Sequence, residues 1–230
     1  MESKLGKHKQ RIIVTGGSGF IGSNLIKRLL HDGGYVEGNQ IVSLDNYSTG
    51  KKENEIEHDN ITYHDVDLSD TDNFDFFMDK PDVIYHMAAI ARIQPSFEHP
   101  LYTFHSNVTA TLNILDWARE KKCPVVYAGS SSTHSGIYKN PYTLSKFQGE
   151  MLCNLYTKVY GLPTSVCRFY NVYGPNQLTE GAYTTLIGAW LKRFEEGKPL
   201  KIFGTGEKRR DFTHVDDIVD GLVRCADGLI

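Results

Sequence analysis

The sequence predicts an α/β fold with a doubly wound parallel sheet and a small, apparently truncated C-terminal lobe. Three observations support this fold class. Short apolar segments rich in β-branched residues alternate with longer amphipathic segments. A glycine-rich loop follows the first apolar segment. After Tyr170 the regular alternation of apolar and amphipathic segments ends. Apolar strands separated by helices are typical of a parallel sheet that is covered on both faces.

The first part of the chain supplies six predicted strands in order. They are Arg11–Thr15, Gln40–Asp45, Ile61–His64, Asp82–Met87, Pro124–Ala128 and Thr164–Tyr170. Helical patterns lie between them at about Gly19–His31, Thr71–Asp79, Leu101–Lys121 and Pro141–Tyr160. Two loops are expected, a glycine-rich one at Asp32–Asn39 and a charged, exposed one at Lys51–Asn60. Right-handed crossovers between such elements give a doubly wound sheet.

The second part begins with a loop of turn-forming residues, 171–183. A helix is predicted at about Thr184–Glu196, a short strand at Leu200–Gly204 and a helix near Asp216–Ala226, with a basic loop before it. We therefore predict a main domain over residues 1–175. Residues 176–230 form a partial lobe whose last helix returns toward the main domain.

Composition excludes several classes of protein. The 230 residues carry 25 basic and 28 acidic side chains, and a net charge of −3 argues against binding nucleic acid through its phosphates. The sequence contains no run of 18 consecutive apolar residues, so it predicts no membrane-spanning helix. The N-terminus is polar and basic and has no apolar core of a signal peptide. The four cysteines form no CxxC pair, so we expect reduced thiols and a cytoplasmic protein.

The glycine loop predicts a dinucleotide site. In RIIVTGGSGFIG, residues 11–22, Gly16, Gly19 and Gly22 separate a predicted strand from a predicted helix. Glycines let the backbone approach a pyrophosphate, and the helix N-terminus supplies free amides. Asp45 ends the second strand, where a carboxylate binds ribose hydroxyls and repels a 2′-phosphate, so NAD is favoured over NADP. The alternative is a turn that only packs the helix on the strand. The domain over 1–175 is thus expected to bind a dinucleotide.

A tyrosine–lysine pair predicts proton transfer. Tyr142 and Lys146 lie four residues apart, after an Asn-Pro sequence that predicts a helix start. Both then share one helix face, and the ammonium and the helix N-terminus are expected to lower the pKa of the phenol. The similar Tyr47–Lys51 pair lies in a loop that contains a glycine. A serine run, 130–132, follows the fifth strand and would place a hydroxyl beside Tyr142; the alternative is a polar loop with capping roles.

These motifs occur together and in a recognisable order: TGGSGFIG (15–22), LDNYSTG (44–50), HMAA (86–89), the serine run, PYTLSK (141–146) and RFYNVYGP (168–175). The chain resembles the extended short-chain dehydrogenase/reductase family, and within it the NAD-dependent nucleotide-sugar epimerases and dehydratases. The resemblance runs from about residue 11 to 226. Within the family, the chain is most similar to members of the UDP-glucose 4-epimerase type.

The resemblance implies that residues 1–175 form a Rossmann domain that holds NAD, and it also implies specific roles for single residues. NAD would be bound by Gly16, Gly19, Phe20, Ile21, Gly22, Asp45, Asn46, Ser48, Thr49, Gly50, Asp67, Leu68, Met87, Ala88, Ala89, Asn107, Tyr142, Lys146 and Tyr170. The catalytic residues would be Ser130, Tyr142 and Lys146, with Lys146 also touching the nicotinamide ribose. A nucleoside diphosphate sugar would be bound by Arg92, Ser130, Asn171 and Arg210. Asn171 and Arg210 would meet its phosphates.

The reaction expected from the serine run is C4 epimerisation through a transient 4-keto sugar. Related dehydratases carry an acidic residue in this run, and here none is present, so elimination lacks its general acid. A 4,6-dehydratase, a ketosugar reductase and a non-catalytic NAD-binding protein remain as alternatives. The reacting hydroxyl is Ser130 or Ser131. By resemblance, the helices at 101–121 and 141–160 are expected to pair with their counterparts in the second subunit of a homodimer.

Three departures from the family pattern concern the substrate. Thr133-His134-Ser135 replaces the usual Val-Tyr-Gly, and only 11 residues separate Ser130 from Tyr142, about a dozen fewer than is typical of the resemblance. The chain also covers only the beginning of the usual substrate lobe.

Other polar groups have simpler interpretations. His86 is expected to be a packed structural histidine. The acidic residues at positions 65, 67, 70 and 72 lack the glycine and glutamate of a calcium loop, and no spacing predicts zinc, so we expect no metal. The Arg209-Arg210 pair has a solvated basic loop as its alternative.

Overall fold

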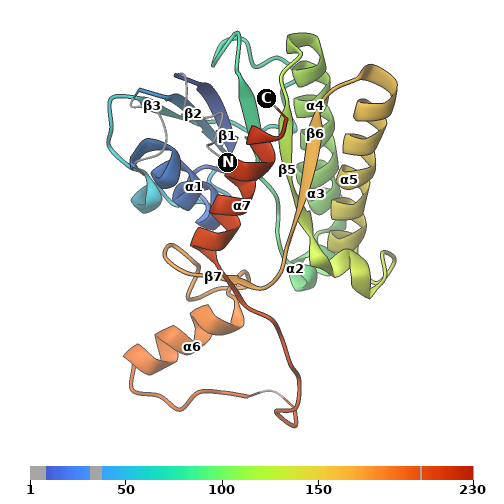
Figure 1. The fold of residues 1–230 in the computed structure, drawn as a ribbon. Helices are drawn as coiled ribbons and strands as arrows, with labels where there is room; N and C mark the ends of the chain where they lie inside the picture. Colours follow the sequence, from blue (N-terminus) through green and yellow to red (C-terminus); the bar gives the residue numbers. More distant parts are fainter. Residues whose placement is uncertain (1–8, 32–37, 203, 230) are drawn as a thin grey trace.

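The computed structural model describes residues 9–31, 38–202 and 204–229. Within these residues, six parallel strands form one sheet in the order β3-β2-β1-β4-β5-β6 (Figure 1). The strands are β1 (Arg11–Thr15), β2 (Gln40–Asp45), β3 (Ile61–Asp65), β4 (Val83–His86), β5 (Val125–Ser130) and β6 (Thr164–Phe169). This order reverses between β1 and β4, which confirms the predicted doubly wound fold.

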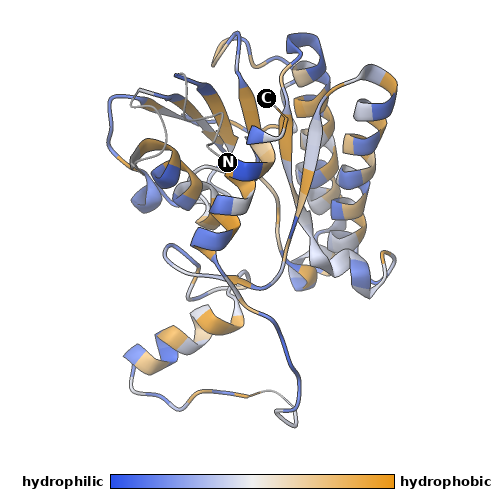
Figure 2. Ribbon diagram, viewed as in Figure 1, coloured by the Kyte–Doolittle hydropathy of each residue, from blue (hydrophilic) through white to orange (hydrophobic). Residues whose placement is uncertain are grey.

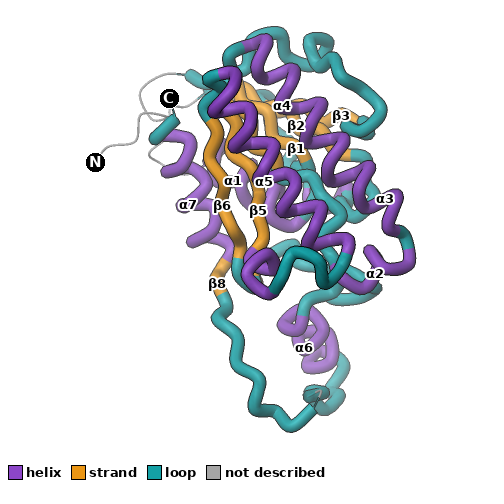
Figure 3. Tube along the Cα trace, turned by 90° about the vertical axis from the view of Figure 1, so that its right-hand side faces the viewer, coloured by secondary structure: helices purple, strands orange, loops and turns teal. Residues whose placement is uncertain are grey.

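The helices cover both faces of the sheet. The helices of the described residues are α1 (Phe20–His31), α2 (Ile93–Glu98), α3 (Pro100–Phe104), α4 (Ala110–Lys121), α5 (Pro141–Tyr160), α6 (Leu186–Glu195) and α7 (Val215–Asp227), of which α6 lies apart from the sheet. Figure 3 shows α7 on one side of the sheet and α3, α4 and α5 on the other. The strands between them are predominantly hydrophobic (Figure 2). None of the described helices is both long and apolar enough to cross a membrane.

Alternate residues of the central strands supply two separate cores. Ile12 and Val14 of β1 pack with residues of α1 and α7, whereas Ile13 packs with residues of α4 and α5. All three β1 side chains are fully buried. Since successive side chains of a strand point to opposite faces, burial on both faces requires a continuous apolar run. This is the physical reason why the strands were readable from the sequence.

The start of α5 follows the predicted capping pattern. The Asn140 side chain accepts a hydrogen bond of 2.8 Å from the amide of Thr143, and Pro141 occupies the first turn. Gly161 ends the helix with a φ of 70°, a conformation that favours glycine. The catalytic pair predicted from the sequence therefore lies at the beginning of a long helix with defined ends.

Residues 101–121 are helical throughout, as predicted for Leu101–Lys121, but they do not form one regular α-helix. A π-helical segment, η2 (His105–Thr109), separates α3 from α4 and carries the buried Asn107. A π-helical turn inserts one extra residue per turn and often marks a functional site.

Two predicted elements are wrong. Thr71–Asp79 forms turns rather than a helix, because the Asn73 side chain accepts from the Asp75 amide while the Thr71 hydroxyl donates to the Asn73 carbonyl. No strand occurs over the described residues of Leu200–Gly204. Of the two predicted loops, residues 32–37 lie outside the described residues, and Lys51–Asn60 contains a short 3₁₀ helix, η1 (Lys52–Asn54).

The segment after β6 extends beyond the sheet and then returns to it. Figure 1 shows α6 below the main body, joined to it by the small parallel pair β7 (Val172–Tyr173) and β8 (Thr213–His214). The next helix, α7, packs beside α1, where Arg28 and Asp220 form an ion pair of 2.8 Å. The chain thus supplies α7 to the core of the main sheet.

Candidate active site

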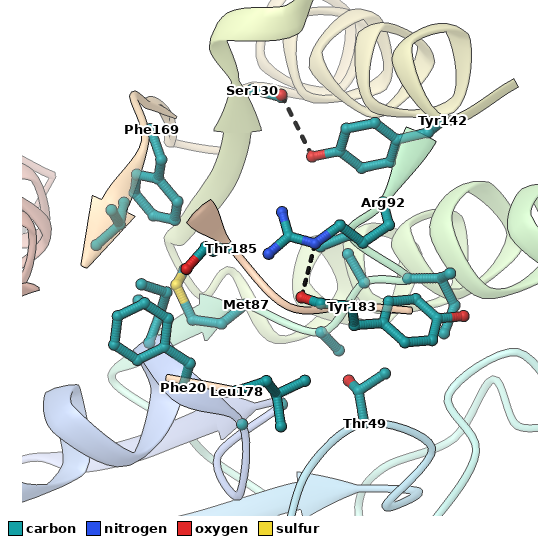
Figure 4. A pocket seen from close by; sticks show the side chains of 18 of the residues that line it. Phe20, Thr49, Met87, Arg92, Ser130, Tyr142, Phe169, Leu178, Tyr183 and Thr185 are labelled. Atoms are coloured by element: carbon teal, nitrogen blue, oxygen red, sulfur yellow. Dashed lines mark hydrogen bonds between the residues drawn. The ribbon is translucent and has the colours of Figure 1, made fainter. Parts of the chain in front are cut away.

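A cavity of about 980 Å³ opens at the carboxyl ends of the parallel strands (Figure 4). Residues at or just after the end of each strand line this cavity. The lining includes residues after β1 and β4, the two neighbouring strands between which the strand order reverses. Ligands of doubly wound folds bind in this crevice. The second wall comes from the segment between β6 and β8, including Tyr183 and Thr185.

The glycine loop brings main chain to the surface of this cavity. Gly16 has a φ of 67°, and a side chain there would lie 2.8 Å from the amide nitrogen of Ala88. A side chain on Gly22 would lie 2.2 Å from the carbonyl oxygen of Gly16. The loop therefore accepts only glycine at both points. Its close main-chain packing at the start of α1 fits the pyrophosphate of a dinucleotide.

Asp45 lies at the end of β2 and is held by two amides. Its carboxylate accepts hydrogen bonds from Ser18, at 3.0 Å, and from Tyr47, at 2.8 Å. Burial raises the pKa of Asp45 more than these amides lower it, and the nearby Glu55 and Asp65 raise it further. This concentration of carboxyl groups disfavours a 2′-phosphate and agrees with the predicted preference for NAD.

Asp67 closes the same end of the cavity. Its carboxylate accepts hydrogen bonds from the Asn46 side chain, at 2.9 Å, and from the Ser69 amide, at 2.9 Å. Burial acts to raise the pKa of Asp67, but these hydrogen bonds outweigh it and hold the pKa below its usual value. Asp67 is therefore an acceptor rather than a proton donor at neutral pH.

Tyr142 and Ser130 meet at the opposite end of the cavity. The phenol of Tyr142 donates a hydrogen bond of 3.3 Å to the Ser130 hydroxyl, which also accepts from the Ser132 amide at 3.2 Å (Figure 4). Of the two serines considered for this role, Ser130 holds the contact to Tyr142. Ser131 lines the cavity beside it.

The electrostatics of Tyr142 differ from the prediction. Burial raises the pKa of the Tyr142 phenol, while the Ser130 hydrogen bond and the positive charge of Arg92 act to lower it. The predicted lowering by Lys146 and the helix N-terminus was wrong as a net effect, because burial outweighs the opposing influences. The cation that acts on this phenol is Arg92.

Lys146 lies behind the cavity wall rather than on it. It is only 3% exposed, and its ammonium lies 4.3 Å from the centre of the Tyr127 ring. Burial lowers the pKa of Lys146 to about 8, against the opposing influence of Cys153 and Glu150. Glu150 is engaged by Arg168, with the closest nitrogen–oxygen distance at 2.7 Å.

Asn107 connects the loop after β4 to the start of α5. Its side chain accepts from the Ile90 amide at 2.7 Å and donates to the Ile90 carbonyl at 3.1 Å and to the Ser145 hydroxyl at 2.9 Å. Ser145 in turn donates to the Tyr142 carbonyl at 2.8 Å. This buried network fixes the spacing between the Arg92 loop and the Tyr142 helix.

The cavity collects most of the residues predicted for the site. The predicted residues that do not line it are Gly50, Asn107 and Lys146. Several lining residues were not predicted, namely Phe169, Leu178, Tyr183, Thr184, Thr185 and Phe212. Most of these come from loops without periodicity, so the sequence offered no signal beyond the turn formers of 171–183.

The remaining polar candidates behave as structural groups. Both ring nitrogens of the buried His86 contact threonine hydroxyls, Thr15 at 2.8 Å and Thr111 at 2.9 Å. Burial lowers the pKa of His86 to about 3, so the ring is neutral and packed, as predicted. Among the described residues, no three histidine, cysteine or acidic side chains gather as a metal site. The four cysteines are free.

Comparison with known proteins identifies the relatives of this chain. The model of the "NAD dependent epimerase/dehydratase family" matches residues 12–228. A UDP-glucose 4-epimerase from Mycolicibacterium smegmatis is 33% identical over 232 residues, covering 93% of this chain and 72% of the relative. A UDP-N-acetyl-alpha-D-glucosaminuronate decarboxylase from Bacillus cytotoxicus is 28% identical, covering 95% and 72%.

Solved structures share the fold over nearly the whole chain. UDP-N-acetylglucosamine 4-epimerase from Methanobrevibacter ruminantium, in complex with UDP-N-acetylmuramic acid, is 29% identical with a TM-score of 0.87, covering 95% of this chain and 73% of that one. WbmF from Bordetella bronchiseptica, solved with NAD⁺, is 30% identical with a TM-score of 0.87, covering 97% and 71%.

Proposed function

Because the chain belongs to the NAD-dependent epimerase/dehydratase family, we propose that it epimerises a nucleoside diphosphate sugar at C4. The observation that carries this proposal is the Tyr142–Ser130 hydrogen bond of 3.3 Å in a cavity without a nearby acid. Within the described chain, the acidic residues that line the cavity are Asp45 and Asp67, which follow β2 and β3. Both lie at the end that suits adenosine.

NAD is the cofactor of this family, and the residues present fit it. The glycine loop would hold the pyrophosphate and Asp45 the adenosine ribose, since the main chain at Gly16 and Gly22 leaves no room for a side chain. When bound, NAD supplies the acceptor and donor of hydride. The Tyr142–Ser130 end of the cavity is then left for the nicotinamide and the reacting sugar.

The residues at that end have complementary roles in the proposed reaction. Tyr142 takes the proton of the sugar 4-hydroxyl when C4 is oxidised and returns it after the 4-keto sugar has turned over. Ser130 hydrogen-bonds the C4 oxygen and passes the proton between it and Tyr142. Lys146 lies beneath them, and its pKa of about 8 keeps most of its charge at neutral pH. We propose that this charge faces the nicotinamide ribose.

The phosphates of the substrate would lie at the other wall. The Asn171 side chain donates a hydrogen bond of 2.8 Å from its Nδ2 to the Asp211 carbonyl, which joins the end of β6 to the loop that carries Arg210. Both Asn171 and Arg210 line the cavity. His134, in the unusual Thr-His-Ser sequence, stacks on Tyr170 at 6.1 Å between ring centres. We assign residues 1–175 to NAD and 176–230 mainly to the substrate.

A panel of nucleotide sugars tests the proposal. Purified protein with NAD should interconvert a C4-epimeric pair among UDP-, dTDP- and GDP-sugars, and Tyr142→Phe should slow the conversion by about 10²- to 10⁴-fold. Failure to convert any member of the panel would refute epimerisation. If calorimetry then showed binding of NAD but of no nucleotide sugar, the chain would be a non-catalytic NAD-binding protein.

Solvent isotope distinguishes the alternative enzyme classes. A 4,6-dehydratase removes the C5 proton and incorporates deuterium at C5 in D₂O, whereas a C4 epimerase incorporates none. The missing acid beside Tyr142 supports the second outcome. A ketosugar reductase would consume NADH in proportion to product, whereas an epimerase regenerates NAD in each cycle.

We also propose a homodimer formed through α4 and α5. Leu112, Met151, Leu155 and Val159 on these helices are between 41% and 61% exposed, which leaves an apolar surface on the side away from the sheet. Light scattering after size exclusion measures the mass directly. Leu155→Glu should convert a dimer into a monomer, and a wild-type monomer would refute this assignment.

A further inference from the structure

Arg92 is a half-buried cation that has no acidic partner within the described parts of the chain. It precedes α2 in the loop after β4, and its Nε donates a hydrogen bond of 2.7 Å to the Tyr183 carbonyl. No carboxylate of the described residues lies within 4 Å of its guanidinium, although ion pairs engage arginines elsewhere, as at Arg168. Burial lowers the pKa of Arg92, which is the cost of keeping this charge away from water.

The guanidinium is fixed so that its free donors face the cavity. Because the Tyr183 carbonyl engages Nε, the two terminal nitrogens point away from it into the cavity, toward the space bounded by Ser130 and Thr185 (Figure 4). The charge is close enough to act on the Tyr142 phenol. A planar fork of N–H donors that is held in this way matches the two oxygens of a carboxylate.

The other charged residues that line the cavity lie away from Arg92. The acidic lining residues Asp45 and Asp67 lie beyond the glycine loop, at the opposite end. Arg210, the other arginine of the lining, is exposed and belongs to the loop before β8. Among the described residues of the lining, no acidic side chain is therefore placed to pair with Arg92.

We propose that Arg92 binds a carboxylate carried by the sugar itself, so that the substrate is a nucleotide-linked uronic acid. This inference rests on the proposed function, which places C4 of the sugar beside Tyr142 and Ser130. In a hexose ring, C6 is attached to C5 and thus follows C4 by two bonds, whereas the diphosphate is attached to C1 across the ring. A group next to the reacting carbon meets Arg92, and the diphosphate extends toward Asn171 and Arg210.

The test compares an acidic with a neutral sugar on the same nucleotide. kcat/KM is measured for UDP-glucuronate and UDP-glucose with the NAD-loaded protein and with Arg92→Gln, Arg92→Lys and Arg210→Gln. The wild type should prefer the uronate, and Arg92→Gln should reduce this preference by about 100-fold. Arg92→Lys keeps a charge and should retain part of the preference. A change at Tyr142 affects kcat/KM for both sugars in the same way, so it cancels in the ratio of the two kcat/KM values.

Arg210→Gln is the matched control, because loss of a diphosphate contact weakens both sugars equally and leaves their ratio unchanged. If Arg92→Gln lowered kcat/KM equally for both sugars, Arg92 would not bind a carboxylate of the sugar and the inference would be overturned. A wild-type enzyme that converts only neutral sugars would overturn it as well, while the proposed function would stand. NAD binding and the thermal melt show whether each variant is folded.

Calorimetry separates the two proposals when no turnover occurs. Binding of UDP-glucuronate that exceeds binding of UDP-glucose and disappears in Arg92→Gln would support the carboxylate site, even if epimerisation failed. Equal binding of both sugars would refute the carboxylate site.

Discussion

Replacing Lys146 by methionine should stabilise the NAD-free protein at neutral pH. The lysine is 3% exposed in the interior of α5, and no carboxylate of the described residues lies within 4 Å of its ammonium. Burial lowers its pKa from 10.5 to about 8. Methionine has a similar length and carries no charge, so it keeps the packing and removes the cost of burying the ammonium.

The size of the effect follows from the pKa difference. At about 1.4 kcal/mol per pH unit, the interval between 10.5 and about 8 corresponds to about 3 kcal/mol. Below pH 8 the folded and unfolded states are both protonated, so the whole cost is present. Between pH 8 and 10.5 the folded state has released the proton and the unfolded state has not, so wild-type stability rises with pH. Above pH 10.5 the cost is absent.

The contact of the ammonium with the Tyr127 ring, at 4.3 Å, offsets part of this cost in the wild type. The pH dependence is therefore the more direct measurement. The advantage of Lys146→Met should decrease by about 2 kcal/mol between about pH 7 and pH 9.5. Urea unfolding at both pH values gives the free energies, and the m-values show whether unfolding stays two-state.

Lys158→Met is the matched control, since Lys158 is exposed on the same helix. Its replacement should change stability equally at the two pH values. An advantage of Lys146→Met that does not depend on pH would refute the view that Lys146 is a buried, destabilising cation. The same variant should lose activity, because the charge proposed to face the nicotinamide ribose is removed.

Four further substitutions test the site and its support. Gly22→Ala places a methyl group 2.2 Å from a backbone oxygen of the glycine loop, so NAD affinity measured by calorimetry should fall at least about tenfold. Tyr142→Phe should lower kcat by about 10²- to 10⁴-fold with NAD content unchanged; normal turnover would exclude Tyr142 as the base. Arg92→Gln removes a charge that lowers the pKa of Tyr142, so the acidic limb of the kcat profile should move to higher pH. Glu150→Gln removes the carboxylate that pairs with Arg168 and should lower the free energy of unfolding, measured in urea, by about 1–3 kcal/mol. The loss is limited because the Arg168 side chain is partly exposed to water. An unchanged midpoint would contradict this.

The sheet was predictable because its chemistry is local. Each central strand is buried on both faces, so its sequence is an uninterrupted apolar run, as in Ile12–Val14. Strand ends were less certain. Ser130 belongs to β5 although polar residues are untypical of a buried strand, because its backbone continues the pairing with Phe169 of β6.

The Thr71–Asp79 segment shows where local patterns mislead. Its apolar positions suit a helix, but Phe74 is fully buried and packs edge-on against Trp117 at 5.5 Å between ring centres. The Trp117 indole also donates to the Asp75 carboxylate at 2.7 Å. Contacts with a residue so distant in sequence, together with side-chain hydrogen bonds to the backbone, outweigh helix propensity.

Half of the site was readable and half was not. The glycine loop, Asp45 and the Tyr142–Ser130 pair follow strand ends or begin a helix, so topology brings them together. Tyr183 lies in a loop without periodicity, and its carbonyl accepts a hydrogen bond from Arg92, 91 residues earlier in the chain. Such a contact leaves no trace in spacing or composition.

The position of α7 has a consequence for the synthesis of this chain. Val215, Val219, Leu222 and Val223 complete the core that lies between α1 and the strands β1, β4 and β5. A ribosome makes every strand of the main sheet before it makes residues 215–227. The part of this face of the nascent sheet that α1 does not cover therefore stays uncovered until α7 leaves the exit tunnel. During that interval the growing chain exposes apolar surface of the kind that chaperones recognise, and the NAD-binding domain cannot finish folding ahead of the segment that follows it.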